Sequence, residues 1–254
     1  MRQSLSGLVL AAMLTACASV EQTGASEQVY DPLEGWNRNV FAFNESVDKA
    51  VLGPAADAYR FVTTPTIRAG VNNSLSNLGQ PVVFANTVLQ GKPGAAFDTL
   101  NRFALNSTVG LAGVFDPATS VGIPRHREDF GQTLGTWGVP GGAFLVIPFG
   151  SGSNVRDVVG LGVDGAMNPL NYAQFENDDE VRIGLTVVGA LAARERLDGA
   201  IEILRDQPEP YTALRRNYDQ SRRAAIRDGR EEQDPYANLP EFDDSFFGDE
   251  EFED

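Results

Sequence analysis

The sequence has little of what enzymes use for chemistry, since 254 residues include one cysteine and one histidine. Cys17 has no second thiol in the chain with which to form a disulfide. We find no phosphate-binding loop, no Gly-x-Ser-x-Gly elbow and no His/Cys cluster with metal-ligand spacing. The sequence therefore predicts no catalytic residue, no metal and no cofactor, and a protein that is not an enzyme.

Two patterns in the chain are compatible with chemistry but favour simpler interpretations. As a catalytic residue, His126 would belong to a hydrolase that acts on envelope lipids. Its neighbours Arg125 and Arg127 disfavour its protonated form, so we interpret His126 as a solvated loop residue. A dinucleotide-binding spacing of glycines also occurs, but no strand precedes it, which favours close helix packing instead: Gly160, Gly162 and Gly165.

Basic residues are scarce, because 20 Lys and Arg stand against 35 Asp and Glu, for a formal net charge of −15. No basic residue follows Arg230, and 231–254 holds eleven acidic residues, a composition that predicts a disordered tail. Five aromatic residues in this tail leave binding to a partner open as an alternative: Tyr236, Phe242, Phe246, Phe247 and Phe252. Nucleic acid is disfavoured as a partner, because phosphate binding needs a basic patch.

The N-terminus has the layout of a secretory signal, in which Arg2 precedes an apolar run over 8–16 that is too short to span a bilayer. The run ends in Leu-Thr-Ala-Cys, which resembles the lipobox of bacterial lipoproteins. We predict a signal peptide over 1–16, lipid attachment at Cys17, and a lipidated N-terminus and linker over 17–30. Ala18, in place of the aspartate that favours inner-membrane retention in lipoproteins, points to the outer membrane.

Apolar periodicity predicts a mainly α-helical chain with one short β-hairpin. Gly53-Pro54 should stop the first helix. Gly79 should close a later helix before Pro81 opens the next, and this later helix carries an apolar stripe of Ile67, Val71, Leu75 and Leu78. We expect 116–153 to be irregular apart from a strand at 143–147. The expected helices are 33–51, 55–62, 64–79, 81–90, 93–104, 153–166, 178–204 and 209–228.

Charge is nearly absent between Phe61 and Phe115, where the charged residues are Arg68, Lys92, Asp98 and Arg102. The polar positions of these helices are amides and hydroxyls. No run is long or apolar enough to span a bilayer. Two interpretations stay open at this point. The helices form the inside of a soluble bundle, or they lie in a membrane with apolar faces toward lipid and uncharged polar faces inward.

Several motifs, in order along 31–230, resemble the MlaA (VacJ) lipoprotein family, and we treat this range as one helical domain. The resemblance is weaker at 141–144, and it does not explain the acidic tail. The residues that carry the match and that we select as site residues are Asp31, Pro32, Glu34, Asn37, Arg38, Asn44, Phe130, Gly131, Gln132, Gly135, Trp137, Arg156 and Asp157.

The resemblance implies a ring-like arrangement of amphipathic helices around a channel, lipid-anchored in the cell outer membrane and facing the periplasm. It implies extraction of mislocalised phospholipids from the outer leaflet and their transfer to a periplasmic lipid carrier protein, in association with a trimeric porin. This is retrograde intermembrane phospholipid transport, which preserves outer-membrane lipid asymmetry. The alternative is a structural porin-associated lipoprotein without lipid-transfer activity.

Local roles for individual side chains follow as hypotheses. Phe144, Val146 and Phe149 of the hairpin form a candidate gate. Arg156 and Asp157 are interpreted as a local ion pair, with contact to lipid headgroups as the alternative. Trp36 and Trp137 are either interfacial anchors or core residues. The arginines of the last helix form either a solvated face or a surface for headgroups or a porin: Arg215, Arg216, Arg222, Arg223 and Arg227.

Overall fold

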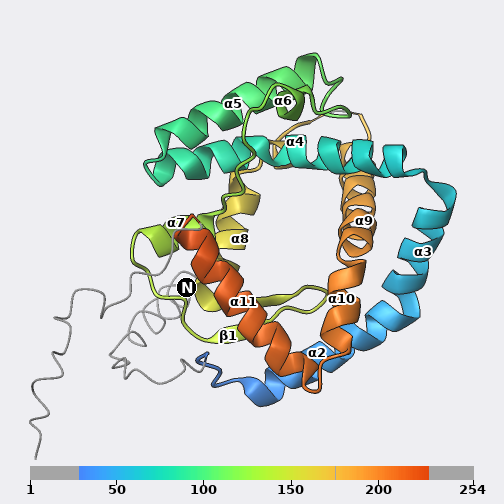
Figure 1. Cartoon of the computed structure of the whole chain (residues 1–254), viewed down its shortest axis with the longest axis vertical. Coiled ribbons are helices and arrows are strands. Elements are labelled where there is room, and N and C mark those ends of the chain that lie inside the picture. The colour runs from blue at the N-terminus through green and yellow to red at the C-terminus, as the bar shows by residue number, and fades with distance from the viewer. Residues whose placement is uncertain (1–28, 175, 229–254) are drawn as a thin grey trace, which may run out of the picture.

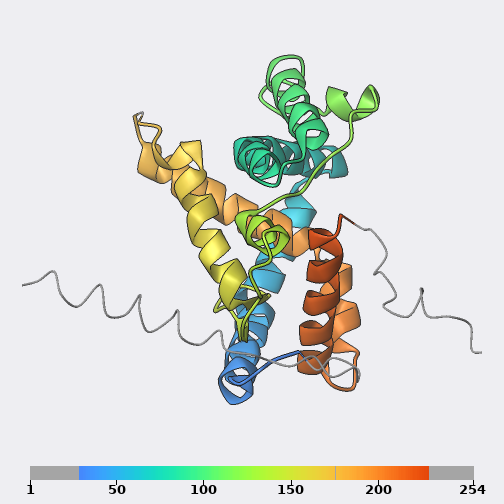
Figure 2. The same cartoon turned by 90° about the vertical axis from the view of Figure 1, so that its left-hand side faces the viewer.

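The structure is a computed structural model that describes residues 29–174 and 176–228. The predicted signal peptide, Cys17 and the acidic tail lie outside the described residues. Helices surround a central opening, with α4 and α5 at one end of the molecule and α2 at the other (Figure 1 and Figure 2). The mainly helical, ring-like arrangement with one short hairpin is confirmed.

The first arc of the ring is a continuous run of α2 (Glu34–Val47), η1 (Asp48–Leu52) and α3 (Gly53–Val62). The predicted stop at Gly53-Pro54 is wrong. The segment η1 is a π-helical turn, in which the amide of Gly53 bonds to the carbonyl of Asp48. A wider turn at this place lets the chain pass a proline without breaking the helix.

The second arc is the antiparallel pair α4 (Pro65–Leu89) and α5 (Pro93–Thr108). The side chain of Thr64 accepts from the amide of Ile67 and so caps α4. The predicted break at Gly79 is wrong, because α4 continues through Pro81. Packing of α4 against α5 offsets the local cost of the proline, about 3 kcal/mol.

The segment expected to be irregular contains two short helices and the hairpin. α6 (Pro117–Ser120) and α7 (Phe130–Thr136) correct the expectation, and each is capped by an aspartate, Asp116 and Asp129. The hairpin is confirmed as β1 (Phe144–Val146) and β2 (Gly152–Asn154), antiparallel with Leu145 opposite Ser153.

The remaining chain consists of α8 (Val155–Met167), η2 (Pro169–Asn171), α9 (Asp178–Arg196), α10 (Asp198–Arg205) and α11 (Pro210–Ile226). The single helix expected over 178–204 is interrupted at Leu197. α9 contacts α3 and α4, and α11 contacts α7, β2 and α10. These contacts, which join segments distant in sequence, close the ring.

Burial in this fold is inverted relative to a water-soluble protein. Among the described residues, sixteen polar or charged side chains are buried and eight hydrophobic ones, whereas 31 large hydrophobic side chains are exposed. The small apolar core lies at the hairpin and consists of Val40, Phe144, Val146 and Tyr211. An apolar exterior of this extent marks a surface that contacts something other than water.

None of the described helices is long and apolar enough to cross a membrane.

Candidate functional site

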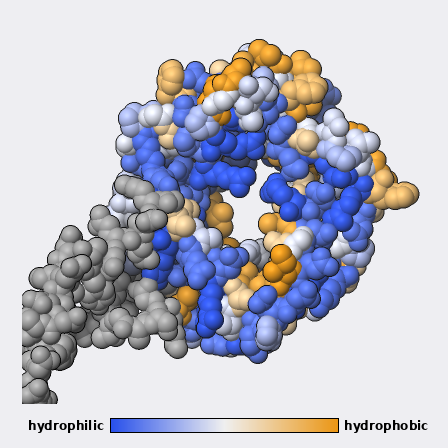
Figure 3. Space-filling view, viewed as in Figure 1, coloured by the Kyte–Doolittle hydropathy of each residue, from blue (hydrophilic) through white to orange (hydrophobic). Residues whose placement is uncertain are grey.

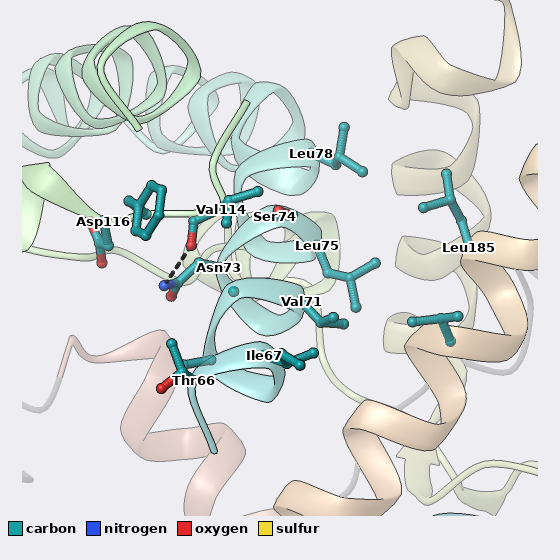
Figure 4. Close-up of a pocket in the computed structure, with 14 residues that line it drawn as sticks. Thr66, Ile67, Val71, Asn73, Ser74, Leu75, Leu78, Val114, Asp116 and Leu185 are labelled. Carbon is teal, nitrogen blue, oxygen red and sulfur yellow. Dashed lines mark hydrogen bonds between the residues drawn. The ribbon is translucent and has the colours of Figure 1, made fainter. Parts of the chain in front are cut away.

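The opening of the ring passes through the molecule and has both hydrophilic and hydrophobic surface on its rim (Figure 3). Next to α4 lies a cavity of about 580 Å³. The apolar stripe expected on this helix faces α9 across the cavity (Figure 4), and α9 contributes Leu185 and Val188. The stripe residues that line the cavity are Ile67, Val71, Leu75 and Leu78.

The opposite side of α4 brings polar groups to the same cavity. Asn73 donates to the backbone carbonyl of Val114 at 3.4 Å, and Asp116 lies beside it. Arg102 and Arg125 contact the Asp116 carboxylate at 2.8 and 2.7 Å. Burial opposes ionisation of this carboxyl, but hydrogen bonds from Thr119, Asn106 and Arg125 outweigh it and lower its pKa. Asp116 is therefore a structural anion rather than a free charge in the cavity.

Where α4 meets α5 and α8, its polar contacts are made by side-chain amides. Asn77 donates to the hydroxyl of Ser107 at 2.8 Å, and Asn86 donates to Asp164 of α8 at 2.9 Å. Thr87 and Thr99 are fully buried, and their hydroxyls donate to carbonyls of their own helices. Small and uncharged polar groups at helix joints are typical of helices that associate in lipid.

The first family motif fixes the start of α2 to the hairpin. Asn37 is fully buried, and its amide donates to Asp31 at 2.8 Å and to the carbonyl of Phe144 at 2.9 Å. The same side chain accepts from the amide of Val146 at 2.9 Å, so it pairs with the strand edge. Asp31 also accepts from the hydroxyl of Tyr211. Replacing Asn37 would break a joint of the ring.

Two further motif residues hold α2 to α11. Arg38 donates to Glu34 at 2.7 Å, and its guanidinium stacks over the Tyr211 ring at 4.5 Å from the centroid. Arg215 lies 2.9 Å from Asp31 and 3.5 Å from Glu34. Pro32 is exposed at this corner, with no side-chain contact that bears on the joint.

A second charged cluster joins α7, α8 and α11. Asp157 pairs with Arg156 at 2.9 Å and with Arg222 at 2.6 Å, and it accepts from Tyr218. Arg222 also donates to Asp129 at 2.5 and 2.6 Å. Burial raises the pKa of Tyr218, and its hydrogen bond to Asp157 raises it further. These contacts occupy Arg156 and Asp157 within the protein, as the ion-pair interpretation expects.

Glycines of the same motif allow the elements of this cluster to approach closely. A Cβ on Gly131 would lie 2.4 Å from Arg222 and 2.6 Å from Asp157, and one on Gly160 would lie 2.4 Å from the Gly131 amide. A Cβ on Gly135 would lie 2.7 Å from Ile226. The glycine pattern at 160–165 thus serves helix packing at its first position, while Gly162 and Gly165 face open space.

The other residues of this motif lie around α7. Gln132 is buried and donates to the carbonyl of Arg127 at 3.0 Å. Phe130 packs edge-on against Trp137 at 6.0 Å, and the Trp137 indole donates to the carbonyl of Leu89. Trp36 and Trp137 are 61% and 53% exposed, which excludes the core alternative for both.

The candidate gate divides into anchored and exposed parts. Phe144 and Val146 are buried in the core, whereas Phe149 is 72% exposed and packs edge-on against Phe43 at 5.3 Å. Asn44 accepts from the amide of Phe149 at 2.8 Å and donates to the carbonyl of Ile147 at 2.9 Å. Gating stays a prediction, and it concerns the loop between the strands.

The sequence analysis missed the partners of the motif carboxylates. They repeat along α11 as Tyr-x-x-x-Arg twice, seven residues apart, and each pair meets one aspartate. This spacing places all four side chains on one helix face and was readable from the sequence. They are Tyr211, Arg215, Tyr218 and Arg222.

Among the described residues no group of acidic, histidine or cysteine side chains is placed to hold a metal ion. His126 lies 3.1 Å from Asp98 and is partly buried, so the solvated-loop interpretation holds only in part.

The molecule is a helical ring with polar joints, an apolar exterior, and an apolar cavity beside an opening that passes through it. These features define a class of protein whose surfaces contact lipid. The comparisons identify the family within this class. The chain belongs to the MlaA lipoprotein family, whose model matches residues 29–225.

Curated relatives and a solved structure agree with this assignment. The chain is 34% identical to the intermembrane phospholipid transport system lipoprotein MlaA of Haemophilus influenzae, over 89% of this chain and 91% of that protein. It is 33% identical to MlaA of Escherichia coli, over 87% of each. A solved structure, described as the structural basis for maintenance of bacterial outer membrane lipid asymmetry, matches with a TM-score of 0.68 and 32% identity, over 77% of this chain and 98% of that one.

Proposed function

We propose that the chain is an outer-membrane lipoprotein of intermembrane phospholipid transport that maintains outer-membrane lipid asymmetry. It takes phospholipids misplaced in the outer leaflet through the ring and passes them to a periplasmic lipid carrier protein. The names of the relatives support the transport role, and the matched structure supports the link to lipid asymmetry. The lipid moves without chemical change, so the chain is not an enzyme.

One observation carries the proposal. Polar side chains are buried and large hydrophobic ones exposed, around an opening whose rim has both hydrophilic and hydrophobic surface. A phospholipid combines a charged head with apolar tails, and a path for it needs walls of both characters. Buried amides and hydroxyls provide polar wall without an unpaired charge, which is expensive to desolvate. The exposed apolar side chains meet the hydrocarbon of the membrane, and lipid on Cys17 would hold the chain there.

Two partners and one moving part extend the proposal. A trimeric porin, which the family resemblance implies, would contact the outer apolar surface of the ring. The carrier would receive lipid on the periplasmic side. The hairpin loop with Phe149 would open and close the path, while the buried Phe144 and Val146 keep the strands in place.

Filling the cavity tests the proposal. Val71→Trp places an indole between α4 and α9, and we expect phospholipid to accumulate in the outer leaflet of cells that carry it. Val88→Trp is the matched control, because Val88 is on the same helix, 54% exposed and outside the cavity lining. The readout is the outer-leaflet phospholipid content of a strain in which the variant replaces the native gene, with protein level measured alongside.

A photo-crosslinking side chain distinguishes transfer from a structural role. We expect a probe at Leu75 to capture phospholipid and a probe at Gln220, on the exposed surface of α11, to capture none. If deletion of the gene left outer-leaflet phospholipid unchanged while porin organisation changed, the structural alternative would replace the proposal.

A further inference from the structure

Arg196 differs from the other cations of α9 and α10. Within the described part of the chain, it has no carboxylate within ion-pair distance, whereas Arg182, Arg194 and Arg205 each contact two. Its Nη1 donates instead to the amide oxygen of Asn72 on α4, at 2.9 Å. The side chain is exposed. Among the residues that the structure describes, no anion therefore neutralises the charge of Arg196.

The position of this charge is next to the apolar cavity. Val71 and Asn73, the neighbours of Asn72 in α4, both line the cavity, and Val188 lines it from α9. Arg196 follows Val188 by eight residues, which is about 12 Å along a helix axis. Figure 4 shows the α4 stripe and Leu185 facing each other across this space. The guanidinium thus lies beyond one end of an apolar compartment.

The local contacts keep this guanidinium available. The adjacent carboxylate of Glu195 is taken by Arg68 at 3.1 Å, so it does not compete for Arg196. Asn72 takes one of the five N–H donors of the guanidinium and sets its direction. The planar fork of arginine matches two oxygens of a phosphate, and this suits a phosphodiester better than a carbonyl or a hydroxyl.

We propose that Arg196, oriented by Asn72, binds the phosphate of a glycerophospholipid whose acyl chain occupies the cavity between α4 and α9. This inference rests on the proposed function and adds to it the residue that selects phosphate-bearing lipids. An apolar compartment alone would accept a diacylglycerol equally well. The arginine gives the site its preference for a phospholipid.

The test compares lipids that differ in the phosphate headgroup. The full lipidated chain in dodecyl maltoside is titrated with dimyristoyl phosphatidylglycerol and with dimyristoylglycerol, and native mass spectrometry measures the bound fraction. We expect Arg196→Gln to weaken binding of the phospholipid about tenfold and to leave binding of the diacylglycerol unchanged. Asn72→Asp, which adds an internal anion for Arg196, should weaken phospholipid binding in the same direction.

Arg216→Gln is the matched control, because Arg216 is an exposed arginine of α11 that does not line the cavity. It should change neither affinity. An Arg196→Gln effect no larger than that of Arg216→Gln, or equal loss for both lipids, would overturn the inference. Displacement of the phospholipid by millimolar inorganic phosphate, with the diacylglycerol still bound, would also overturn the inference, because the site would then bind free phosphate.

Failure of the proposed function looks different from failure of the inference. If the function fails, the native chain binds neither lipid and Val71→Trp has no effect in cells. If only the inference fails, the native chain binds both lipids and Val71→Trp still blocks transport, but Arg196→Gln changes nothing.

Discussion

Two arcs of the same ring are held together by different chemistry. The α4–α5 arc joins through amides, hydroxyls and small residues, as at Asn77–Ser107, and exposes Phe97 and Leu100. The arc that begins with α2 and η1 joins α9, α10 and α11 through buried ion pairs, as at Asp48 of η1, which Arg194 of α9 and Arg205 of α10 contact. Both arcs bury polar groups, but the contact between α4 and α5 is made by uncharged groups, and the ion pair of Arg102 with Asp116 ties α5 to the start of α6 instead.

The contrast indicates which medium surrounds each arc. Charged pairs with partly exposed edges are stable where water reaches them, whereas uncharged joints avoid the desolvation of ions in hydrocarbon. The two arcs lie at opposite ends of the molecule (Figure 1). We infer that the α4–α5 end lies in the hydrocarbon and that the α2–α11 end lies toward water.

The largest effect is expected at the charged end. Asp157→Ala removes the carboxylate shared by Arg156, Arg222 and Tyr218 and leaves buried cations unpaired. We expect the free energy of unfolding to fall by about 3–5 kcal/mol. Denaturant unfolding in detergent micelles measures it. Glu209→Ala is the control, since Glu209 meets Arg38 at 3.5 Å on the surface, and its loss should be below about 1 kcal/mol.

A lysine on the exposed surface of the α4–α5 end should weaken the binding of the chain to the membrane. Phe97 is 65% exposed on α5, and Phe97→Lys should reduce membrane affinity by about 2–3 kcal/mol. Flotation of the chain with vesicles reports this. The control is Ile203→Lys, since Ile203 is equally exposed, at 67%, on α10, and the loss there should be smaller because that end lies toward water. Equal losses at both sites would remove the difference between the arcs.

The glycine contact between α7 and α8 should tolerate no side chain. Gly160→Ala brings a Cβ to 2.4 Å from the Gly131 backbone, and overpacking of this kind destabilises by about 1–3 kcal/mol. Gly162→Ala, two residues along the same helix, meets open space and should be neutral or stabilising because alanine favours helix. Melting temperatures of the two variants compare them directly, and a similar loss in both would contradict the packing.

Acid should loosen the joints of α10 and α11 before those of α5, where the pKa of Asp116 is lowered most strongly. Burial raises the pKa of Asp129 and Asp48, but their arginine partners outweigh it, so the folded-state pKa of each lies below the ordinary value. Such carboxylates stabilise the fold above their unfolded pKa, about 4, and lose this contribution as the pH falls through the folded value. Hydrogen exchange at low pH should rise in α10 and α11 before it rises in α4 and α5.

The sequence predicts element type well and tertiary closure poorly. The expected stripe Ile67, Val71, Leu75 and Leu78 lies on one face of α4 and lines the cavity, because the helical period alone decides which side chains share a face. Helix ends predicted at Pro54 and Pro81 were wrong. A π-helical turn accommodates Pro54 and packing against α5 accommodates Pro81, each within a longer helix. A prediction from local sequence includes the backbone hydrogen bond that a proline removes, but it does not include the tertiary contacts that offset this loss.

The motif residues selected from the sequence lie in the joints of the ring. Asp31, Asn37 and Asp157 join its elements and do not line the cavity. The two aspartates have partners on α11, and for Asp157 the tyrosine partner lies 61 residues further along the chain. Pairing over such separations depends on ring closure, which no single segment encodes.

The most direct test of the account is to measure what surrounds α5. A nitroxide is placed at Phe97 and, separately, at Gln220 of the chain reconstituted in phospholipid vesicles, and its collision rates with oxygen and with a water-soluble nickel chelate are recorded. The account predicts that the Phe97 label meets oxygen and is shielded from nickel, while the Gln220 label meets nickel. Nickel access at both positions would contradict the claim that the exposed apolar arc lies in hydrocarbon.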